Sequence, residues 1–314
     1  MIRILANDGM EQSAQEMLKQ AGFEVVTGKI SQEDLINHIN EFEVLTVRSA
    51  TKVRKPLIDA ITTIRLIIRG GVGLDNIDVE YAQQKGITVK NTPFSSTQSV
   101  AELVFAHLTG LVRFFPESNR EMPQRGIERF KELKEKFSKG SELKGKTIGF
   151  IGFGNIGQAT AKIAIGCGMN VLAYDLYPRD WNLELNLMNQ TKISFPIFPS
   201  GKEELLRNSD IISIHSAGSA EVITSEEINV LKTGVIIINC ARGGAIKEEV
   251  LINALNTGKV SYAGLDVFEE EPTHNSALLQ HPRVSLTPHI GASTKEAQQR
   301  IGRDVADIIL NFKF

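Results

Sequence analysis

The sequence is poor in cysteine and contains no long apolar run. Two cysteines, Cys167 and Cys240, are too few for a disulfide framework or a four-cysteine zinc site, and they fit a reducing cytoplasm. Uninterrupted apolar runs such as residues 235–238 are far shorter than the ~20 residues of a membrane span, and the N-terminus has no signal-peptide pattern. We therefore expect a cytoplasmic protein without a metal site or a membrane segment.

An excess of one charge is also missing. Lysine and arginine number 35 and aspartate and glutamate 37, so the net charge is −2 and no strong field draws the chain to nucleic acid or to an anionic membrane. We expect a small-molecule substrate and no nucleic-acid or membrane partner. The 314 residues, 42% of them hydrophobic, exclude a mostly disordered chain and suggest about two domains.

Short apolar runs alternate with amphipathic segments along most of the chain. This alternation predicts an α/β fold in which helices cover both faces of parallel sheets. A first series predicts strands at residues 2–6, 23–26, 44–47, 65–68 and 87–89, and helices at 11–20, 32–39 and 79–85. A second series predicts strands at residues 147–151, 171–174, 211–214, 235–239, 262–266 and 284–287, and helices at 158–165, 202–207, 225–231 and 248–256.

The segments outside these two series have other patterns. Residues 99–115 predict a helix too apolar to lie on a surface, and residues 127–139 predict a charged helical segment with a solvated face. Residues 178–200 are interpreted as an extended connection, and residues 293–311 predict a final helix. His107 lies within the apolar helix, and we interpret it as a packing residue.

A glycine-rich turn begins the second series. The strand ending at Ile151 runs into Gly152-Phe153-Gly154-Asn155-Ile156-Gly157, and a helical pattern follows. These glycines permit a tight turn, a close approach of the backbone to a pyrophosphate, and close packing of helix against strand, while the helix N-terminus attracts phosphates. Asp175, eighteen residues after the last glycine, is suited to bind ribose hydroxyls. Its negative charge favours NAD over NADP, although the nearby Arg179 leaves NADP open. The alternative interpretation of the whole motif is a structural turn followed by an unrelated aspartate.

Polar residues follow the last three strands of the second series. They are Arg242, a run of glutamates at residues 269–271, and His289. Because ligands bind at the carboxyl ends of parallel strands, we expect these residues to share one edge with the dinucleotide. The arginine can bind a carboxylate or polarise a carbonyl, and the histidine can exchange a hydroxyl proton during hydride transfer. A glutamate bonded to that histidine would favour its protonated form.

Each of these residues also has a plainer interpretation. Arg242 could be a charge at a helix end, the glutamates solvated loop acids, and His289 a loop histidine with satisfied hydrogen bonds. His215, after the strand at 211–214, is predicted to line the adenine side. Cys240 is interpreted as packing near the nicotinamide, because no base lies close to it in the sequence.

Together these motifs resemble those of the D-isomer-specific 2-hydroxyacid dehydrogenases over nearly the whole chain. The resemblance is carried by the glycine-rich turn with Asp175 and by residues 239–244, 264–272 and 287–292. It implies that Arg242, Glu271 and His289 are the catalytic residues. Glu271 is chosen among the three glutamates because the acid of the family stands directly before a proline.

The resemblance also implies the domain organisation. It divides the chain into a flavodoxin-like substrate domain, residues 1–98 plus 289–314, and a Rossmann-like NAD domain, residues 99–288. Both domains are doubly wound. The chain crosses between them twice, on entering the helix at residues 99–115 and just after Pro288, and these two crossings form a hinge. The family further implies a homodimer formed through the NAD domain, with the apolar helix at residues 99–115 as an interface element.

Within the family, the sequence is most similar to the phosphoglycerate dehydrogenases of serine synthesis. The closer match lies at residues 47–52, 69–78 and 291–297. It implies oxidation of D-3-phosphoglycerate to 3-phosphohydroxypyruvate with NAD. A glyoxylate/hydroxypyruvate reductase, a D-lactate dehydrogenase or an NAD-sensing, corepressor-like protein are the alternatives. The loop at residues 216–221 lacks the usual proline-rich pattern, and no regulatory domain is expected after the last helix.

Two sets of binding residues follow from the motifs and the resemblance. The cofactor is expected to contact Gly152, Gly154, Asn155, Ile156, Gly157, Asp175, His215, Ser216, Cys240, Ala241, Arg242, Asp266, His289, Gly291 and Ala292. The substrate is expected to contact Arg48, Ser49, Thr51, Lys52, Gly71, Val72, Gly73, Arg242 and His289. Arg48 could instead be an ordinary surface charge at a strand end.

Overall fold

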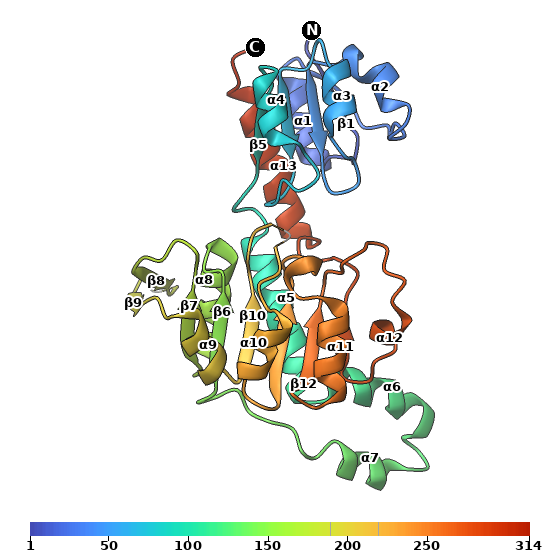
Figure 1. Ribbon diagram of the computed structural model, residues 1–314. Helices are drawn as coiled ribbons and strands as arrows, with labels where there is room; N and C mark the ends of the chain where they lie inside the picture. The colour runs from blue at the N-terminus through green and yellow to red at the C-terminus, as the bar shows by residue number, and fades with distance from the viewer. Residues whose placement is uncertain (189, 219) are drawn as a thin grey trace. The chain divides into compact units, whose positions relative to one another are not determined.

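The computed structural model describes residues 1–188, 190–218 and 220–314, so Asn189 and Ser219 lie outside the described residues. The chain divides into two compact units, Met1–Thr97 with Ala292–Phe314, and Gln98–Gly291 (Figure 1). Each unit is α/β with its own parallel sheet, which confirms the predicted fold class. None of the helices in the described part of the chain has the length and apolar character that a membrane crossing requires.

The sheet of the first unit has the strand order β2-β1-β3-β4-β5, the flavodoxin-like arrangement. Its strands are β1 (Arg3–Ala6), β2 (Glu24–Val26), β3 (Val44–Val47), β4 (Leu66–Arg69) and β5 (Thr88–Asn91). Its helices are α1 (Gln12–Gln20), α2 (Leu35–His38) with the 3-10 turn η1 (Ile39–Glu41), α3 (Lys55–Ala60), α4 (Val79–Gln84) and α13 (Lys295–Leu310).

Helices cover both faces of this sheet. Helices α1 and α13 pack on one face through Leu18, Ile301 and Val305. Helices α2, α3 and α4 cover the other face, where Leu35 and Ile58 are buried. With both faces covered, the carboxyl ends of the strands remain as an edge where polar residues can meet a ligand.

The sheet of the second unit has the order β13-β12-β11-β10-β6-β7. Its strands are β6 (Thr147–Ile151), β7 (Asn170–Tyr174), β10 (Ile211–Ile214), β11 (Val235–Asn239), β12 (Val260–Leu265) and β13 (Val284–Leu286), and a separate hairpin joins β8 (Trp181–Asn186) to β9 (Lys192–Ile197). Its helices are α5 (Thr97–Val112), α6 (Phe115–Arg125), α7 (Phe130–Lys136), α8 (Asn155–Gly166), α9 (Lys202–Asn208), α10 (Ser225–Val230), α11 (Glu248–Asn256) and α12 (Ser276–Leu279), with the 3-10 turn η2 (Gly243–Ala245).

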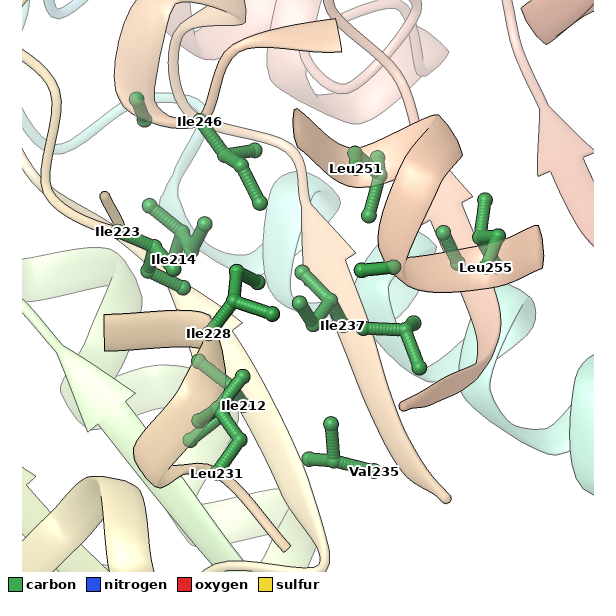
Figure 2. Packing of buried hydrophobic residues seen from close by; sticks show 14 of the residues in the cluster. Ile212, Ile214, Ile223, Ile228, Leu231, Val235, Ile237, Ile246, Leu251 and Leu255 are labelled. Carbon is green, nitrogen blue, oxygen red and sulfur yellow. The ribbon is translucent and has the colours of Figure 1, made fainter. Parts of the chain in front are cut away.

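The core of the second unit lies on both sides of this sheet. Figure 2 shows one side, where Ile212, Ile214 and Ile237 of the strands meet the side chains of α10 and α11. On the other side α5 and α8 pack over Phe150 and Ile238. All five residues of β11 are buried, as expected for a central parallel strand.

Two expectations about the segments outside the two series were wrong. Residues 178–200 are not an extended connection, because β8 and β9 pair antiparallel and bury Trp181 and Leu183 against α8 and Phe153. The apolar helix ends at Val112, because Phe114 adopts a left-handed conformation (φ 56°) before α6 begins. Helix α5 is moreover a core element of its own unit, with ten buried residues.

The division of the chain differs slightly from the expected boundaries. The resemblance predicts that residues 289–291 belong to the first domain, whereas the second unit extends to Gly291. The cause is local, because the backbone N–H groups of Ile290 and Gly291 donate to the Asp266 carboxylate of the second unit.

Gly149 of β6 provides a test of the core packing. A Cβ added there would lie 2.3 Å from Ser209 Oγ and 2.6 Å from Leu205 Cδ2. We expect Gly149→Ala to lower the free energy of unfolding by about 1–3 kcal/mol, measured by urea denaturation, because the tight site must expand.

Gly166 of α8 is the matched control, because nothing lies within 4 Å of a Cβ added there. Gly166→Ala should leave stability unchanged or raise it by up to about 1 kcal/mol. Equal stabilities for the two variants would contradict the packing of β6 against α9.

Candidate active site

The glycine-rich turn connects β6 to α8. Gly152 has φ +89°, and a Cβ there would lie 2.7 Å from the backbone carbonyl of His215. A Cβ on Gly157 would lie 2.7 Å from the Gly152 carbonyl oxygen. At Gly154, by contrast, nothing lies within 4 Å of an added Cβ, and no side chain caps the first turn of α8. The turn therefore leaves free helix amides and open space, which fit a pyrophosphate.

Asp175 is held beside this turn at the end of β7. Its Oδ2 accepts a hydrogen bond from the Phe153 amide (2.7 Å), and its Oδ1 accepts one from the Tyr177 amide (3.0 Å). Each carboxylate oxygen keeps a further lone pair for a ribose hydroxyl. Arg179 is exposed. The fixed negative charge opposes a 2′-phosphate at this position.

His215 and Ser216 follow β10, next to the glycine-rich turn. Desolvation lowers the pKa of His215 to about 3, so its ring is neutral, and Nε2 lies 2.8 Å from Ser213 Oγ. The hydroxyl of Ser216 is buried and has no hydrogen-bond partner among the described residues. A buried, unsatisfied hydroxyl beside free helix amides is a further feature that fits a bound dinucleotide.

Arg242 lies on a turn organised by Asn239 at the end of β11. Asn239 Nδ2 donates to the Arg242 carbonyl (2.8 Å), and Asn239 Oδ1 accepts from the Ala241 amide (3.0 Å). The Arg242 guanidinium donates to the Ala241 carbonyl (2.7 Å). A Cβ on Gly243 would lie 1.8 Å from the Phe268 carbonyl oxygen, so this turn packs tightly against the loop after β12.

The thiol of Cys240 precedes this turn. Burial raises its pKa, and the charge of Asp266 acts in the same direction. The group therefore stays a protonated thiol, which agrees with packing and not with a nucleophile.

His289 and Glu271 form a hydrogen-bonded pair, with 2.7 Å between His289 Nδ1 and Glu271 Oε2. The hydrogen bond to the Glu271 carboxylate raises the pKa of His289, although partial burial acts to lower that pKa. Burial would raise the pKa of Glu271, but the bond and the charge of His289 outweigh it and lower that pKa. Together these shifts favour an imidazolium–carboxylate pair, with Nε2 as the ring nitrogen that remains for a substrate.

The other two glutamates of the run have different surroundings. Glu269 accepts from the Glu248 amide at the start of α11, and the Glu248 carboxylate accepts from the Glu269 amide. Glu270 is exposed. Only Glu271 of the three reaches His289 through a hydrogen bond in the described part of the chain.

Asp266 is the buried acid of this edge, with 1% of its surface exposed. It accepts hydrogen bonds from the Thr287 hydroxyl (2.6 Å) and from the amides of Ile290 and Gly291 (both 2.8 Å). These bonds fix the loop that carries His289. The Thr287 hydroxyl in turn lies 3.0 Å from Nε2 of His107, a contact that the interpretation of His107 as a packing residue missed.

The first unit holds the remaining candidates, at the ends of β3 and β4. The Asp8 carboxylate accepts from the amides of Arg48 and Thr51, and Asn76 Nδ2 donates to their carbonyls. Arg48 is half-buried, and Ser49 and Lys52 are exposed.

Thr51 differs from the expectation. It is buried, and its hydroxyl donates to Asp8 (2.7 Å) and accepts from Asn7 (2.8 Å). No hydroxyl hydrogen is left for a substrate. The residue supports the loop instead of presenting a ligand contact.

The amides expected at residues 71–73 are also not equivalent. The Gly71 amide donates to the Arg69 carbonyl (2.9 Å), whereas no hydrogen-bond partner for the amides of Val72 and Gly73 is found among the described residues. These two amides are therefore the ones that can receive a carboxylate.

Arg48 also lines a cavity of about 320 Å³ within the first unit. Thr46 lines the same cavity, and its buried hydroxyl has no partner among the described residues. Asp8 and Glu11 line it too, with carboxylates that accept backbone hydrogen bonds.

Residues 105–291 match the family described as D-isomer specific 2-hydroxyacid dehydrogenase, NAD binding domain. The chain is 40% identical over 314 residues to the hydroxypyruvate reductase of Thermotoga maritima, covering 98% of this chain and 97% of that protein. It is also 40% identical over 314 residues to the D-3-phosphoglycerate dehydrogenase of Methanocaldococcus jannaschii, covering 98% of this chain but 57% of that protein. Among solved structures, D-lactate dehydrogenase from Aquifex aeolicus, complexed with NAD and lactic acid, aligns with a TM-score of 0.77 and 28% identity over 98% of this chain and 94% of that one.

Glu271→Gln tests the charge coupling at His289. Removing the carboxylate removes the main cause of the raised pKa, so the pKa of His289 should fall to or below the ordinary value of about 6.5. NMR titration of the ring measures this shift. Glu270→Gln, a change of the neighbouring exposed acid, is the control and should leave the titration unchanged. A pKa that stays raised in Glu271→Gln would contradict the coupling.

Proposed function

The chain belongs to the D-isomer specific 2-hydroxyacid dehydrogenase family, and on that basis we propose that it oxidises D-3-phosphoglycerate to 3-phosphohydroxypyruvate with NAD. The observation that carries the proposal is the His289–Glu271 pair. It lies in the same unit as Arg242 and the uncapped glycine-rich turn, on loops that follow parallel strands. A polarised acid–base group, a cationic anchor and a dinucleotide cradle are the parts that hydride transfer on a hydroxy acid requires.

The residues that would hold the cofactor are those of the glycine-rich turn, Asp175 and Ser216. The amides at the start of α8 would bind the pyrophosphate, and the Asp175 carboxylate would accept the ribose hydroxyls. Asn155, Ile156, Cys240, Ala241 and Ala292 stay among the proposed contacts. When bound, NAD supplies the acceptor for the hydride that leaves the substrate carbon.

His289 is the proposed acid–base residue. In oxidation its neutral Nε2 takes the hydroxyl proton, and in reduction the protonated ring returns it. Because Glu271 raises the pKa of His289, the ring stays protonated to higher pH. Oxidation should therefore accelerate as pH rises through that pKa, and reduction should slow over the same interval. Arg242 would bind the substrate carboxylate or polarise its carbonyl.

Arg48 is the proposed phosphate ligand, with Ser49 and Lys52 adding a hydroxyl and a charge. Its backbone is fixed by Asp8 and Asn76, which reduces the entropy lost when the side chain binds an anion. The amides of Val72 and Gly73 would receive the substrate carboxylate. A second candidate, reduction of hydroxypyruvate, is favoured by the Thermotoga relative, which this chain matches over 97% of its length.

We also propose a homodimer formed through the second unit. Phe115 and Met122 of α6, Ile127, and Phe130 of α7 are exposed apolar side chains on a segment that extends beyond the sheet (Figure 1). Exposed apolar side chains that cluster in this way are characteristic of protein interfaces. Helix α5 is not part of this proposal, because its apolar residues pack within the unit.

A substrate panel tests the proposed reaction. We expect NADH formation with D-3-phosphoglycerate and NADH consumption with 3-phosphohydroxypyruvate, and slower consumption with hydroxypyruvate, glyoxylate and pyruvate. Arg48→Ala should raise the KM of the phosphorylated substrates about 10- to 100-fold, because a charged hydrogen bond is lost, and leave the others unchanged.

Arg54→Ala is the control for this variant. Arg54 is another arginine of the first unit, but it pairs with Asp78 at 2.7 Å on the surface. Turnover of hydroxypyruvate without turnover of the phosphorylated pair would exclude the first candidate and leave the second. Binding of NADH without turnover of any oxo acid would favour a sensing protein.

His289→Asn separates proton transfer from backbone conformation. His289 has φ 53°, which asparagine tolerates better than most residues. Without the acid–base group we expect kcat to fall by about 10²–10⁴-fold while NADH still binds, as measured by fluorescence titration. Near-normal turnover of this variant would rule out His289 as the acid–base residue.

A further inference from the structure

His107 is a buried histidine of α5 that lies between two hydroxyl groups. It is 3% exposed, its Nδ1 lies 2.9 Å from Ser285 Oγ, and its Nε2 lies 3.0 Å from Thr287 Oγ1. Gly264 of β12 makes room for it, because a Cβ at that position would lie 2.7 Å from the His107 Cβ. An amphipathic ring with both nitrogens paired differs from a side chain that only fills space.

The chemistry of the partners fixes the direction of every bond. The Asp266 carboxylate only accepts, so the Thr287 hydroxyl donates its single hydrogen to Asp266. Thr287 must then accept from His107, which places a hydrogen on Nε2. Desolvation lowers the pKa of His107, so the ring is neutral and Nδ1 accepts from the Ser285 hydroxyl. The chain of donors therefore runs one way, from Ser285 through His107 and Thr287 to Asp266.

Asp266 passes this constraint to the residues on either side of His289, through the Thr287 hydroxyl before it and two backbone amides after it. Its two oxygens accept from the amides of Ile290 and Gly291, and Thr287 lies two residues before His289. His289 itself is held at φ 53°, a left-handed conformation that residues with a side chain rarely adopt. The amide bonds to Asp266 fix the residues after His289, while His289 itself donates its amide to the Thr287 carbonyl and bonds to Glu271.

Helix α5 contacts the same loop at a second point. Ser99 Oγ donates to the Gly291 carbonyl (2.5 Å), and a Cβ on Gly291 would lie 3.2 Å from the Val100 side chain. The loop at residues 287–291 is thus bonded to α5 at both of its ends, through His107 at Thr287 and through Ser99 at Gly291.

We propose that His107 is a positioning residue for the reaction: through Thr287 and Asp266 it holds the backbone that presents His289 to the substrate. This inference rests on the proposed function, because it assumes that His289 transfers the proton. An apolar side chain of similar size would fill the same volume. It would leave the hydroxyls of Ser285 and Thr287 without this partner, and Thr287 free to turn away from Asp266.

The test compares His107→Met with His107→Gln. Methionine keeps the volume and removes both bonds, whereas the glutamine amide can still donate to Thr287. For whichever 2-hydroxy or 2-oxo acid the wild type turns over, we expect His107→Met to lower kcat about tenfold, the effect of one or two lost hydrogen bonds. The KM for NADH should change less than twofold. The apparent pKa that is assigned to His289 in the pH profile of kcat should shift. His107→Gln should recover most of kcat.

Thr109→Ala is the matched control, because its hydroxyl bonds to the Phe105 carbonyl within α5. It should have the kcat of the wild type. If His107→Met does not fold, Thr287→Val removes the same connection with almost no change of volume, and because it also removes the donor to Asp266 it should lower kcat at least as much. The double variant His107→Met/Thr287→Val should be no slower than Thr287→Val alone, because both substitutions interrupt the same series of hydrogen bonds.

Three results would overturn the inference: wild-type kcat in His107→Met, no recovery in His107→Gln, or additive losses in the double variant. A wild type that turns over no acid would instead reject the proposed function. In that case the NMR titration of His289 still decides, because the inference requires its pKa to differ between the wild type and His107→Met.

Discussion

A buried carboxylate is stable only where donors surround it, and Asp266 finds three donors in the loop that follows β13. Much of the surrounding sequence can be understood from that requirement. Gly291 leaves little room for a side chain, because its Cβ would lie 3.0 Å from an Asp266 oxygen. Thr287 must carry a hydroxyl, and His289 must accept a left-handed backbone between these two bonds. A single desolvated anion thus fixes the loop that carries His289, the proposed acid–base residue.

Ionised and neutral groups are segregated along this edge of the second unit. His107 and His215 are neutral and Cys240 is a thiol, in each case because burial disfavours the charged form. The charges of this edge that we propose act on a substrate are those of Arg242 and of the partly exposed His289–Glu271 pair. The near-zero net charge of the chain therefore says little about its chemistry, because the charges that matter belong to individual side chains at this edge.

The sequence predicts features that depend on local backbone patterns, such as strand ends and glycine turns. It predicts less well the hydrogen bonds between side chains that are far apart in the chain. The rule that parallel strands end at a common edge predicts that a glutamate of the loop after β12 meets His289, as Glu271 does, and the spacing of glycines predicts the turn before α8. The partners of His107 lie 178 and 180 residues away, so a helical pattern could indicate its burial but not its hydrogen bonds. The burial of the Thr51 hydroxyl escapes prediction for the same reason, because its partners Asp8 and Asn7 lie more than 40 residues away.

The hairpin was missed for a different reason. Its signal was present, because Trp181, Leu183 and Leu185 alternate with polar residues. The run is short, however, and prolines and polar residues flank it. Its hydrophobic partners, Phe153 and the residues of α8, belong to an earlier part of the chain. Local alternation of this length predicts a strand only when its packing surface is known.

The hairpin also has a consequence for the outer strand of the second sheet. In a Rossmann sheet a further strand would lie beside β7, but within the described residues a single parallel bridge, between Ala173 and Pro199, continues the sheet. Proline has no N–H to offer a neighbouring chain, and Pro196 interrupts the donors of β9 in the same way. The segment that replaces a strand therefore also caps the sheet, and it protects an otherwise open edge from pairing with the strands of other molecules.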